Sequence, residues 1–122
     1  MKRSRVQTVL FVCSQNRLRS PTAEQVFSRR QDLEVDSAGT NYDAENPLTA
    51  ELVTWADVIF AMEKAQRSKL QRRFRAVLGG RRVVCLDIPD DYAFMQPELI
   101  RRLETRVSRH LPALPPTQEP HA

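Results

Sequence analysis

Short apolar runs rich in β-branched and aromatic residues recur along this chain, and segments of helical character separate them. This alternation predicts an α/β fold with a parallel sheet, because parallel strands need crossover connections between them. The predicted strands lie at 6–12, 33–38, 57–62 and 81–87. The predicted helices lie at 21–30, 48–55, 64–78 and 96–111. With right-handed crossovers, these elements predict a three-layer α/β/α sandwich around a four-stranded parallel sheet.

The length of 122 residues and the hydrophobic content of 41% suit a single packed core. We expect one domain at 1–111 and a proline-rich C-terminal tail at 112–122. The first apolar run, 9–12, is too short for a secretory signal or a membrane span, so we expect a cytoplasmic protein without a membrane partner. Disulfides are rare in that compartment, which predicts free thiols at Cys13 and Cys85.

The formal net charge of +4 favours anionic partners. Between Glu63 and Asp87 the chain carries many basic residues and no acidic one. This stretch could be a weak nucleic-acid footprint, and an exposed helix face explains it equally well. His110 and His121 form no metal-ligand spacing with either cysteine, so we expect no metal site.

Ligands of parallel α/β sheets bind beyond the carboxyl ends of the strands. The loop after the first strand begins at Cys13 and reaches Arg19 and Ser20, a Cys-x5-Arg-Ser spacing that is weak evidence alone in so arginine-rich a chain. The residues around this spacing give stronger evidence, because Ser20 suits a helix N-cap and Pro21 suits the first helical turn. Backbone N–H groups of such a loop, with the helix dipole, form an anion-binding nest.

In that nest Arg19 could bind two phosphoryl oxygens, and Cys13 could act as a thiolate nucleophile. The alternative is that Cys13 is only a small buried apolar residue at the end of a strand. The polar residues between Cys13 and Arg19 favour the nucleophile.

The segment 9–24 resembles the low-molecular-weight protein tyrosine phosphatase family, as do 36–40, 56–63 and 88–92. The resemblance implies a flavodoxin-like (phosphotyrosine phosphatase I-like) fold. It also implies a cysteine-dependent phosphomonoesterase that acts on phosphotyrosine through a phosphocysteine intermediate and needs no cofactor. Its partner would be a phosphorylated substrate, and we expect a monomer or weak dimer.

The same resemblance implies roles for individual residues. Cys13 would be the nucleophile, Arg19 the phosphate ligand and Asp90 the general acid, with Asp91 as the alternative acid. Asp87 would be only the last residue of its strand. The phosphate-binding or supporting residues of the loop would be Ser14, Gln15, Asn16, Arg17, Leu18 and Ser20.

Several positions depart from the family pattern. Leu18 stands where many members carry a second cysteine, Gln15 replaces a glycine, and Arg17 replaces an apolar residue of the pocket wall. The segment 41–47 is shorter than the family segment that forms part of that wall. We expect Tyr92 on the wall, with Tyr42 or Phe94 as substitutes for a missing second tyrosine.

Three alternative functions remain open from the sequence. The same chemistry could act on a nucleotide or an RNA terminus. An arsenate reductase would need Cys85 as a resolving cysteine, and we expect Cys85 to be buried within its strand. A non-catalytic module could bind phosphate without turnover.

Overall fold

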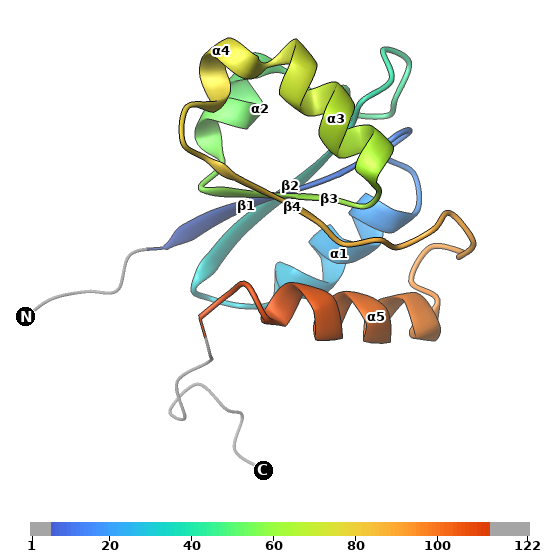
Figure 1. The fold of residues 1–122 in the computed structure, drawn as a ribbon. Coiled ribbons are helices and arrows are strands. Elements are labelled where there is room, and N and C mark those ends of the chain that lie inside the picture. Colours follow the sequence, from blue (N-terminus) through green and yellow to red (C-terminus); the bar gives the residue numbers. More distant parts are fainter. Residues whose placement is uncertain (1–5, 113–122) are drawn as a thin grey trace, which may run out of the picture.

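The computed structural model describes residues 6–112, so nearly all of the predicted C-terminal tail lies outside the described residues. The chain alternates strands and helices, as Figure 1 shows. The strands are β1 (Gln7–Cys13), β2 (Leu33–Gly39), β3 (Val58–Ala61) and β4 (Arg82–Cys85). The helices are α1 (Arg19–Phe27), α2 (Ala50–Trp55), α3 (Lys64–Arg73), α4 (Arg75–Leu78) and α5 (Pro97–Ser108).

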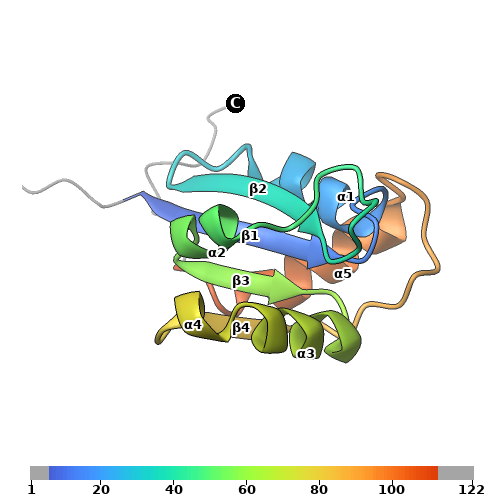
Figure 2. The ribbon, with the colours of Figure 1, turned by 90° about the horizontal axis from the view of Figure 1, so that it is seen from above.

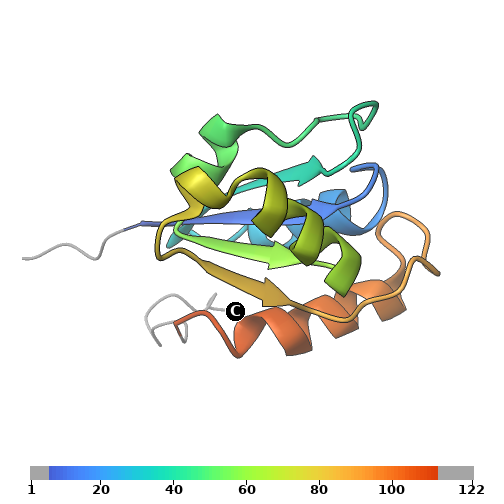
Figure 3. The same ribbon diagram turned by 45° about the horizontal axis from the view of Figure 1, so that its top comes forward.

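The four strands form one parallel sheet in the order β2-β1-β3-β4. β1 is central, and Val9, Leu10, Phe11 and Val12 are fully buried. A strand covered on both faces reads as a continuous apolar run rather than an alternating one, which is the pattern seen here. Since all four strands run the same way, their carboxyl ends and the loops that follow lie at one edge of the sheet (Figure 3).

Helices cover both faces of the sheet, α1 and α5 on one and α2, α3 and α4 on the other (Figures 1 and 2). The first face packs through a cluster that includes Phe11, Phe27 and Leu103. The second packs through a cluster that includes Val12 and Leu70. The predicted α/β/α sandwich is therefore confirmed. Within the described residues, none of the helices is long and apolar enough to cross a membrane.

One predicted helix, 64–78, is wrong as a single element. It is divided into α3 and α4 at Phe74, whose φ of −117° and ψ of 25° lie outside the helical region. Phe74 packs against the apolar cluster of this face together with Val77, while Leu78 is buried within that cluster. The change of direction thus lets a short second helix bury its apolar side. Gly79, with a φ of 57°, ends it, a conformation that glycine adopts without strain.

Candidate active site

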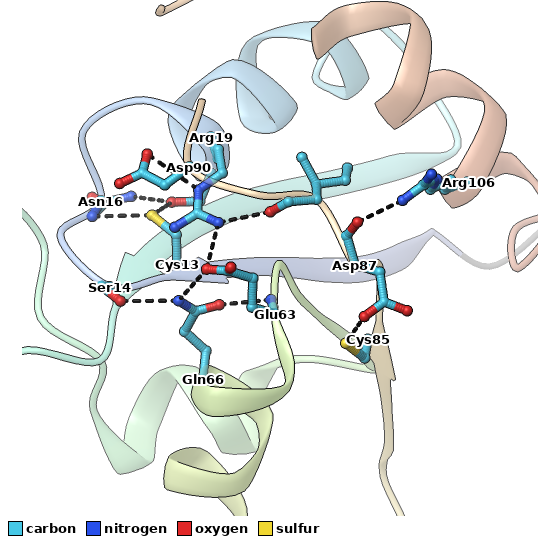
Figure 4. Close-up of polar contacts among 12 residues, drawn as sticks. Cys13, Ser14, Asn16, Arg19, Glu63, Gln66, Cys85, Asp87, Asp90 and Arg106 are labelled. Carbon is cyan, nitrogen blue, oxygen red and sulfur yellow. Dashed lines mark hydrogen bonds and ion pairs between the residues drawn. The ribbon is translucent and has the colours of Figure 1, made fainter. Parts of the chain in front are cut away.

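Cys13 is the last residue of β1, and only 3% of it is exposed. Two groups lie within hydrogen-bonding distance of its sulfur (Figure 4). The backbone N–H of Asn16 donates to Sγ at 3.1 Å, and the Ser20 hydroxyl lies 2.9 Å from Sγ. The loop from Ser14 to Leu18 thus turns back over the sulfur at the carboxyl end of the central strand.

Ser20 does not cap α1, which corrects the prediction from the sequence. The helix begins at Arg19, Leu18 occupies the N-cap position, and no side chain caps it. Ser20 lies in the first turn and is fully buried. Its hydroxyl contacts Cys13 and accepts a hydrogen bond from Asn16, so it is engaged in the site instead of at the helix end.

Asn16 holds the loop from within. Its φ of 58° is a left-handed conformation, which asparagine tolerates better than most residues. Its side-chain N–H₂ group donates to Ser20 Oγ and to Ser37 Oγ, both at 2.9 Å. Ser37, on β2, donates in turn to Glu24 Oε1 on α1 at 2.5 Å.

These hydrogen bonds have a defined direction. A carboxylate only accepts, so the Ser37 proton goes to Glu24 and the Ser37 oxygen receives an N–H of Asn16. The other N–H of Asn16 goes to Ser20. The Ser20 proton is then left for Cys13 Sγ, the arrangement that stabilises a thiolate.

Arg19 is nearly fully buried, with 4% of it exposed. Its Nη1 donates to Glu63 Oε1 at 2.8 Å and to the backbone oxygen of Ile88 at 2.7 Å. Its Nε lies 3.7 Å from Asp90 Oδ1. Arg19 therefore connects α1 with the residues that follow β3 and β4, and the structure brings Cys13, Arg19 and Asp90 into one site (Figure 4).

The three aspartates after β4 lie in different surroundings. Asp90 is exposed and pairs with Arg19. Asp91 is also exposed and has no side-chain partner among residues 6–112. Asp87, with a φ of 57°, accepts a hydrogen bond from Cys85 at 3.4 Å, and its carbonyl accepts one from Arg106. Asp87 thus lies on the side of the loop away from Cys13 (Figure 4).

Residues 8–54 match the family model described as low molecular weight phosphotyrosine protein phosphatase. This segment contains the Cys13 loop with the strands on either side of α1. Over these residues the chain is similar to this family. This similarity supports a cysteine-based phosphatase, a hydrolase of phosphorylated substrates.

Solved structures of phosphatases share the fold. The YwlE arginine phosphatase from Geobacillus stearothermophilus is 24% identical, with a TM-score of 0.66 over 85% of this chain and 90% of that one. The tyrosine phosphatase Wzb from Escherichia coli K30, in complex with phosphate, is 19% identical, with a TM-score of 0.69 over 86% and 96%. The Erwinia amylovora tyrosine phosphatase AmsI is 22% identical, with a TM-score of 0.68 over 85% and 90%. No curated protein matches the chain.

The segment 41–47 lies directly beside the Cys13 loop. Asn41 N–H donates to the Ser14 carbonyl at 3.0 Å, and Glu45 N–H donates to the Gln15 carbonyl at 3.0 Å. Gly39, just before this segment, is packed so closely that an added Cβ would lie 2.5 Å from the Ser14 oxygen. A glycine is therefore needed where β2 meets the Cys13 loop.

The rim of the site is more polar than the family pattern predicts. Arg17 is exposed and lies 3.7 Å from Glu45, and Leu18 is 37% exposed. Gln15, in place of the family glycine, is half-buried. The substituted positions thus place a surface ion pair beside the loop.

The two tyrosines predicted for the pocket wall contact different helices. Tyr42 is 82% exposed, and the guanidinium of Arg73 on α3 lies 4.7 Å from its ring centre. Tyr92 packs against the core cluster on the α1 and α5 face, with Arg102 of α5 at 5.9 Å from its ring centre. Phe94 is 50% exposed. The two rings thus lie against different helices, and their part in a pocket wall stays a prediction.

Sequence reasoning gave no role to four residues that contact the site: Glu24, Ser37, Glu63 and Gln66. Glu63 and Gln66 form a capping box at the start of α3, with each side chain bonded to the other's backbone N–H. Their spacing of three residues before a helix is the signal that could have found them. Contact with the Cys13 loop could not be read from that spacing.

Cys85 is half-buried, so the prediction that β4 buries it is wrong. β4 is an edge strand, and its last residue remains partly open to solvent. Partial burial raises the pKa of the Cys85 thiol, and the Asp87 carboxylate contributes to the rise. Within residues 6–112, no group of three or more His, Cys, Asp or Glu side chains could hold a metal ion.

Proposed function

We propose that this phosphatase hydrolyses phosphomonoesters, phosphotyrosine of proteins first among them, through a phosphocysteine intermediate on Cys13. The observation that carries the proposal is the sulfur itself, at 3.1 Å from the Asn16 N–H and 2.9 Å from the Ser20 hydroxyl. The buried guanidinium of Arg19 belongs to the same loop. A nucleophile, an oriented support and an anion ligand are thus supplied by eight consecutive residues.

In the first step, Cys13 Sγ attacks phosphorus, an S–P bond forms, and the P–O bond to the leaving group breaks. Asp90 donates a proton to the leaving oxygen. In the second step, Asp90 accepts a proton from water, the water oxygen attacks phosphorus, and the S–P bond breaks to release phosphate. The Ser20 hydroxyl then stabilises the departing thiolate of Cys13.

Arg19 would supply the positive charge for both steps. Its two hydrogen bonds to Glu63 and Ile88 are both made by Nη1. The edge of the guanidinium formed by Nε and Nη2 makes no hydrogen bond within residues 6–112, and Asp90 Oδ1 lies 3.7 Å from Nε. This edge could bind two phosphoryl oxygens beside Asp90, a bidentate geometry that lysine could not provide. Backbone N–H groups of the loop, together with Gln15, Arg17 and Leu18, would complete the phosphate cradle.

The ion pair with Arg19 supports Asp90 as the general acid in preference to Asp91. An acid next to the phosphate ligand is within reach of the leaving oxygen, whereas Asp91 has no contact with the described site. The mechanism also needs a reduced Cys13, which fits a cytoplasmic setting. Tyr92 and Tyr42 would flank an aromatic substrate from opposite sides.

The test is Cys13→Ser, assayed with an aryl phosphate. We expect turnover to fall by about 10⁴-fold or more, because the nucleophile is lost while its cradle remains. The variant should still bind vanadate, and mass spectrometry after rapid quenching of the wild type should find phosphate on Cys13. Retained turnover in Cys13→Ser would contradict the mechanism.

A second candidate substrate is the phosphate of a nucleotide or an RNA terminus. Four cationic side chains on the outer side of α3 and α4 have no hydrogen bond or ion pair to the rest of residues 6–112: Lys64, Arg67, Arg72 and Arg75. Unpaired cations suit a polyanion. Specificity constants for a phosphotyrosine peptide, a nucleotide and a terminally phosphorylated oligonucleotide decide between the candidates, and a strong preference for either nucleic substrate would remove the tyrosine assignment.

A further inference from the structure

Gln66 is a buried polar residue of α3 that contacts the first residue of the loop after Cys13. Only 3% of it is exposed. Its Nε2 donates to Ser14 Oγ at 2.9 Å and lies 3.4 Å from Glu63 Oε1 (Figure 4). A buried amide connects two segments that are 52 positions apart in the sequence.

The backbone fixes which end of the amide faces the loop. The Glu63 N–H donates to Gln66 Oε1 at 2.7 Å. A flipped amide would place its N–H₂ group against that N–H and leave two donors facing each other. Nε2 therefore points to Ser14 and Oε1 to the backbone, so the capping box of α3 orients the contact with the phosphatase loop.

This contact in turn decides what the Ser14 hydroxyl can do. Its oxygen accepts the hydrogen from Gln66, so its own proton is free to be donated. Among residues 6–112 that proton has no acceptor, and Ser14 is only half-buried. The Ser14 hydroxyl therefore lies next to Cys13 with its oxygen already engaged and its proton available to a bound anion.

We propose that Ser14 Oγ–H donates to a phosphoryl oxygen of the substrate and that Gln66 is the positioning residue that aims it. The assignment rests on the proposed phosphatase function. The same turn of α3 reaches the other end of the loop, where Glu63 Oε1 accepts from Arg19 Nη1 at 2.8 Å. The start of α3 thus sets the positions of two donors on opposite ends of the Cys13 loop.

The test compares Ser14→Ala, Gln66→Ala and the double variant in aryl phosphate hydrolysis. Each single change should lower kcat/KM by about tenfold, the usual effect of losing one hydrogen bond to a charged group. The double variant should lose no more than either single variant, because both changes remove one interaction. Losses that multiply, or a Ser14→Ala variant with unchanged kcat/KM, would overturn the assignment.

Two variants separate positioning from helix stability. Gln66→Glu keeps an oxygen for the Glu63 N–H while removing the donor to Ser14, so it should lower kcat/KM. Its Tm, measured alongside, reports the separate cost of burying a carboxylate beside Glu63. Gln71→Ala makes a related change on the exposed side of the same helix and should leave kcat/KM unchanged. If Gln66→Glu retained full activity, Gln66 would be a helix cap only.

A binding measurement keeps this inference separate from the proposed function. Inorganic phosphate should protect Cys13 from alkylation, and Ser14→Ala and Gln66→Ala should each raise the protecting concentration by about tenfold. A wild type without turnover would refute the phosphatase mechanism, and the phosphate measurement would still decide the role of Gln66. Unchanged protection in both variants would refute that role.

Discussion

The two cysteines end two strands of the same parallel sheet, yet their surroundings are opposite. Cys13 ends the central strand, is buried, and receives hydrogen bonds at its sulfur from the Cys13 loop. Cys85 ends an edge strand, is half-buried, and donates to the Asp87 carboxylate. One environment supplies donors that stabilise a thiolate, and the other supplies an acceptor that keeps the proton on sulfur.

The comparison shows that position in the fold does not make a thiol reactive. Both sulfurs lie at the carboxyl ends of the strands, where ligands bind in this kind of fold. Of the two, only Cys13 is followed by a loop whose backbone donates to the sulfur, through the Asn16 N–H. The hydrogen bond of Cys85 to Asp87 also gives no support to the arsenate reductase alternative, which needs a thiol directed at Cys13.

The largest expected contrast is between substitutions of the two cysteines themselves. Cys85→Ser should change kcat/KM for an aryl phosphate by less than about twofold, the scale of a surface substitution remote from the reacting groups. Cys13→Ser should abolish turnover. Both variants are measured side by side with Tm as the control for folding. A large loss in Cys85→Ser would give the second thiol a part in the reaction.

Substitutions of Asp90 and Asp87 should differ in their effect on kcat in the same way. Asp90→Asn should lower kcat by about a hundredfold or more, since general acid catalysis is lost. Asp87→Asn makes the same chemical change three positions earlier and should leave kcat nearly unchanged. The two variants are compared on substrates with good and poor leaving groups. Equal losses in both would remove the distinction between the two aspartates.

Oxidation should be harder to reverse here than in members with a second loop cysteine. Leu18 offers no thiol, and Cys85 donates to Asp87, so we expect peroxide to carry Cys13 past the sulfenic acid. Dithiothreitol should restore little activity to the wild type and should restore more to Leu18→Cys. Full recovery of the wild type, lost in Cys85→Ser, would show that the two cysteines pair.

The smallest effect concerns the Cys85 thiol. Its pKa is raised above the ordinary value of 9.0, so the unreactive thiol form persists to higher pH than in a free cysteine. Asp87→Asn removes the negative charge that contributes to this rise and should speed alkylation of Cys85 a few-fold at pH 8. The rate is followed by mass spectrometry in a Cys13→Ser background. Slower alkylation would mean that Asp87 does not hold the proton.

Much of the fold could be predicted because its strands are short apolar runs bounded by helices. The division at Phe74 could not, since the residues on both sides keep a helical spacing and only packing against the core bends the chain. Ser20 was predicted as a cap from its place before Pro21. The sulfur of Cys13 and the amide of Asn16, which engage its hydroxyl, lie nearby only in the folded loop.

The sequence predicts the part of the site formed by consecutive residues and does not predict contacts between residues far apart in the sequence. Cys13 and Arg19 share one loop, so their spacing and context indicate it. Gln66 contacts that loop across 52 positions, and its sequence signal describes only a helix cap. The contact of Tyr42 with Arg73 of α3 and the packing of Tyr92 on the core cluster also join distant positions, which the sequence does not show.

The partners of Arg19 have a consequence for folding. The sulfur and its donors lie within eight residues, so this part of the site can form early by local contacts. The guanidinium is held by hydrogen bonds to Glu63 and Ile88, at sequence separations of 44 and 69, and by the ion pair with Asp90. A partly folded chain in which β3 and β4 have not yet docked would carry a formed cysteine loop with an unplaced arginine. Activity should therefore appear only in the last stage of folding, after the loop itself is protected from hydrogen exchange.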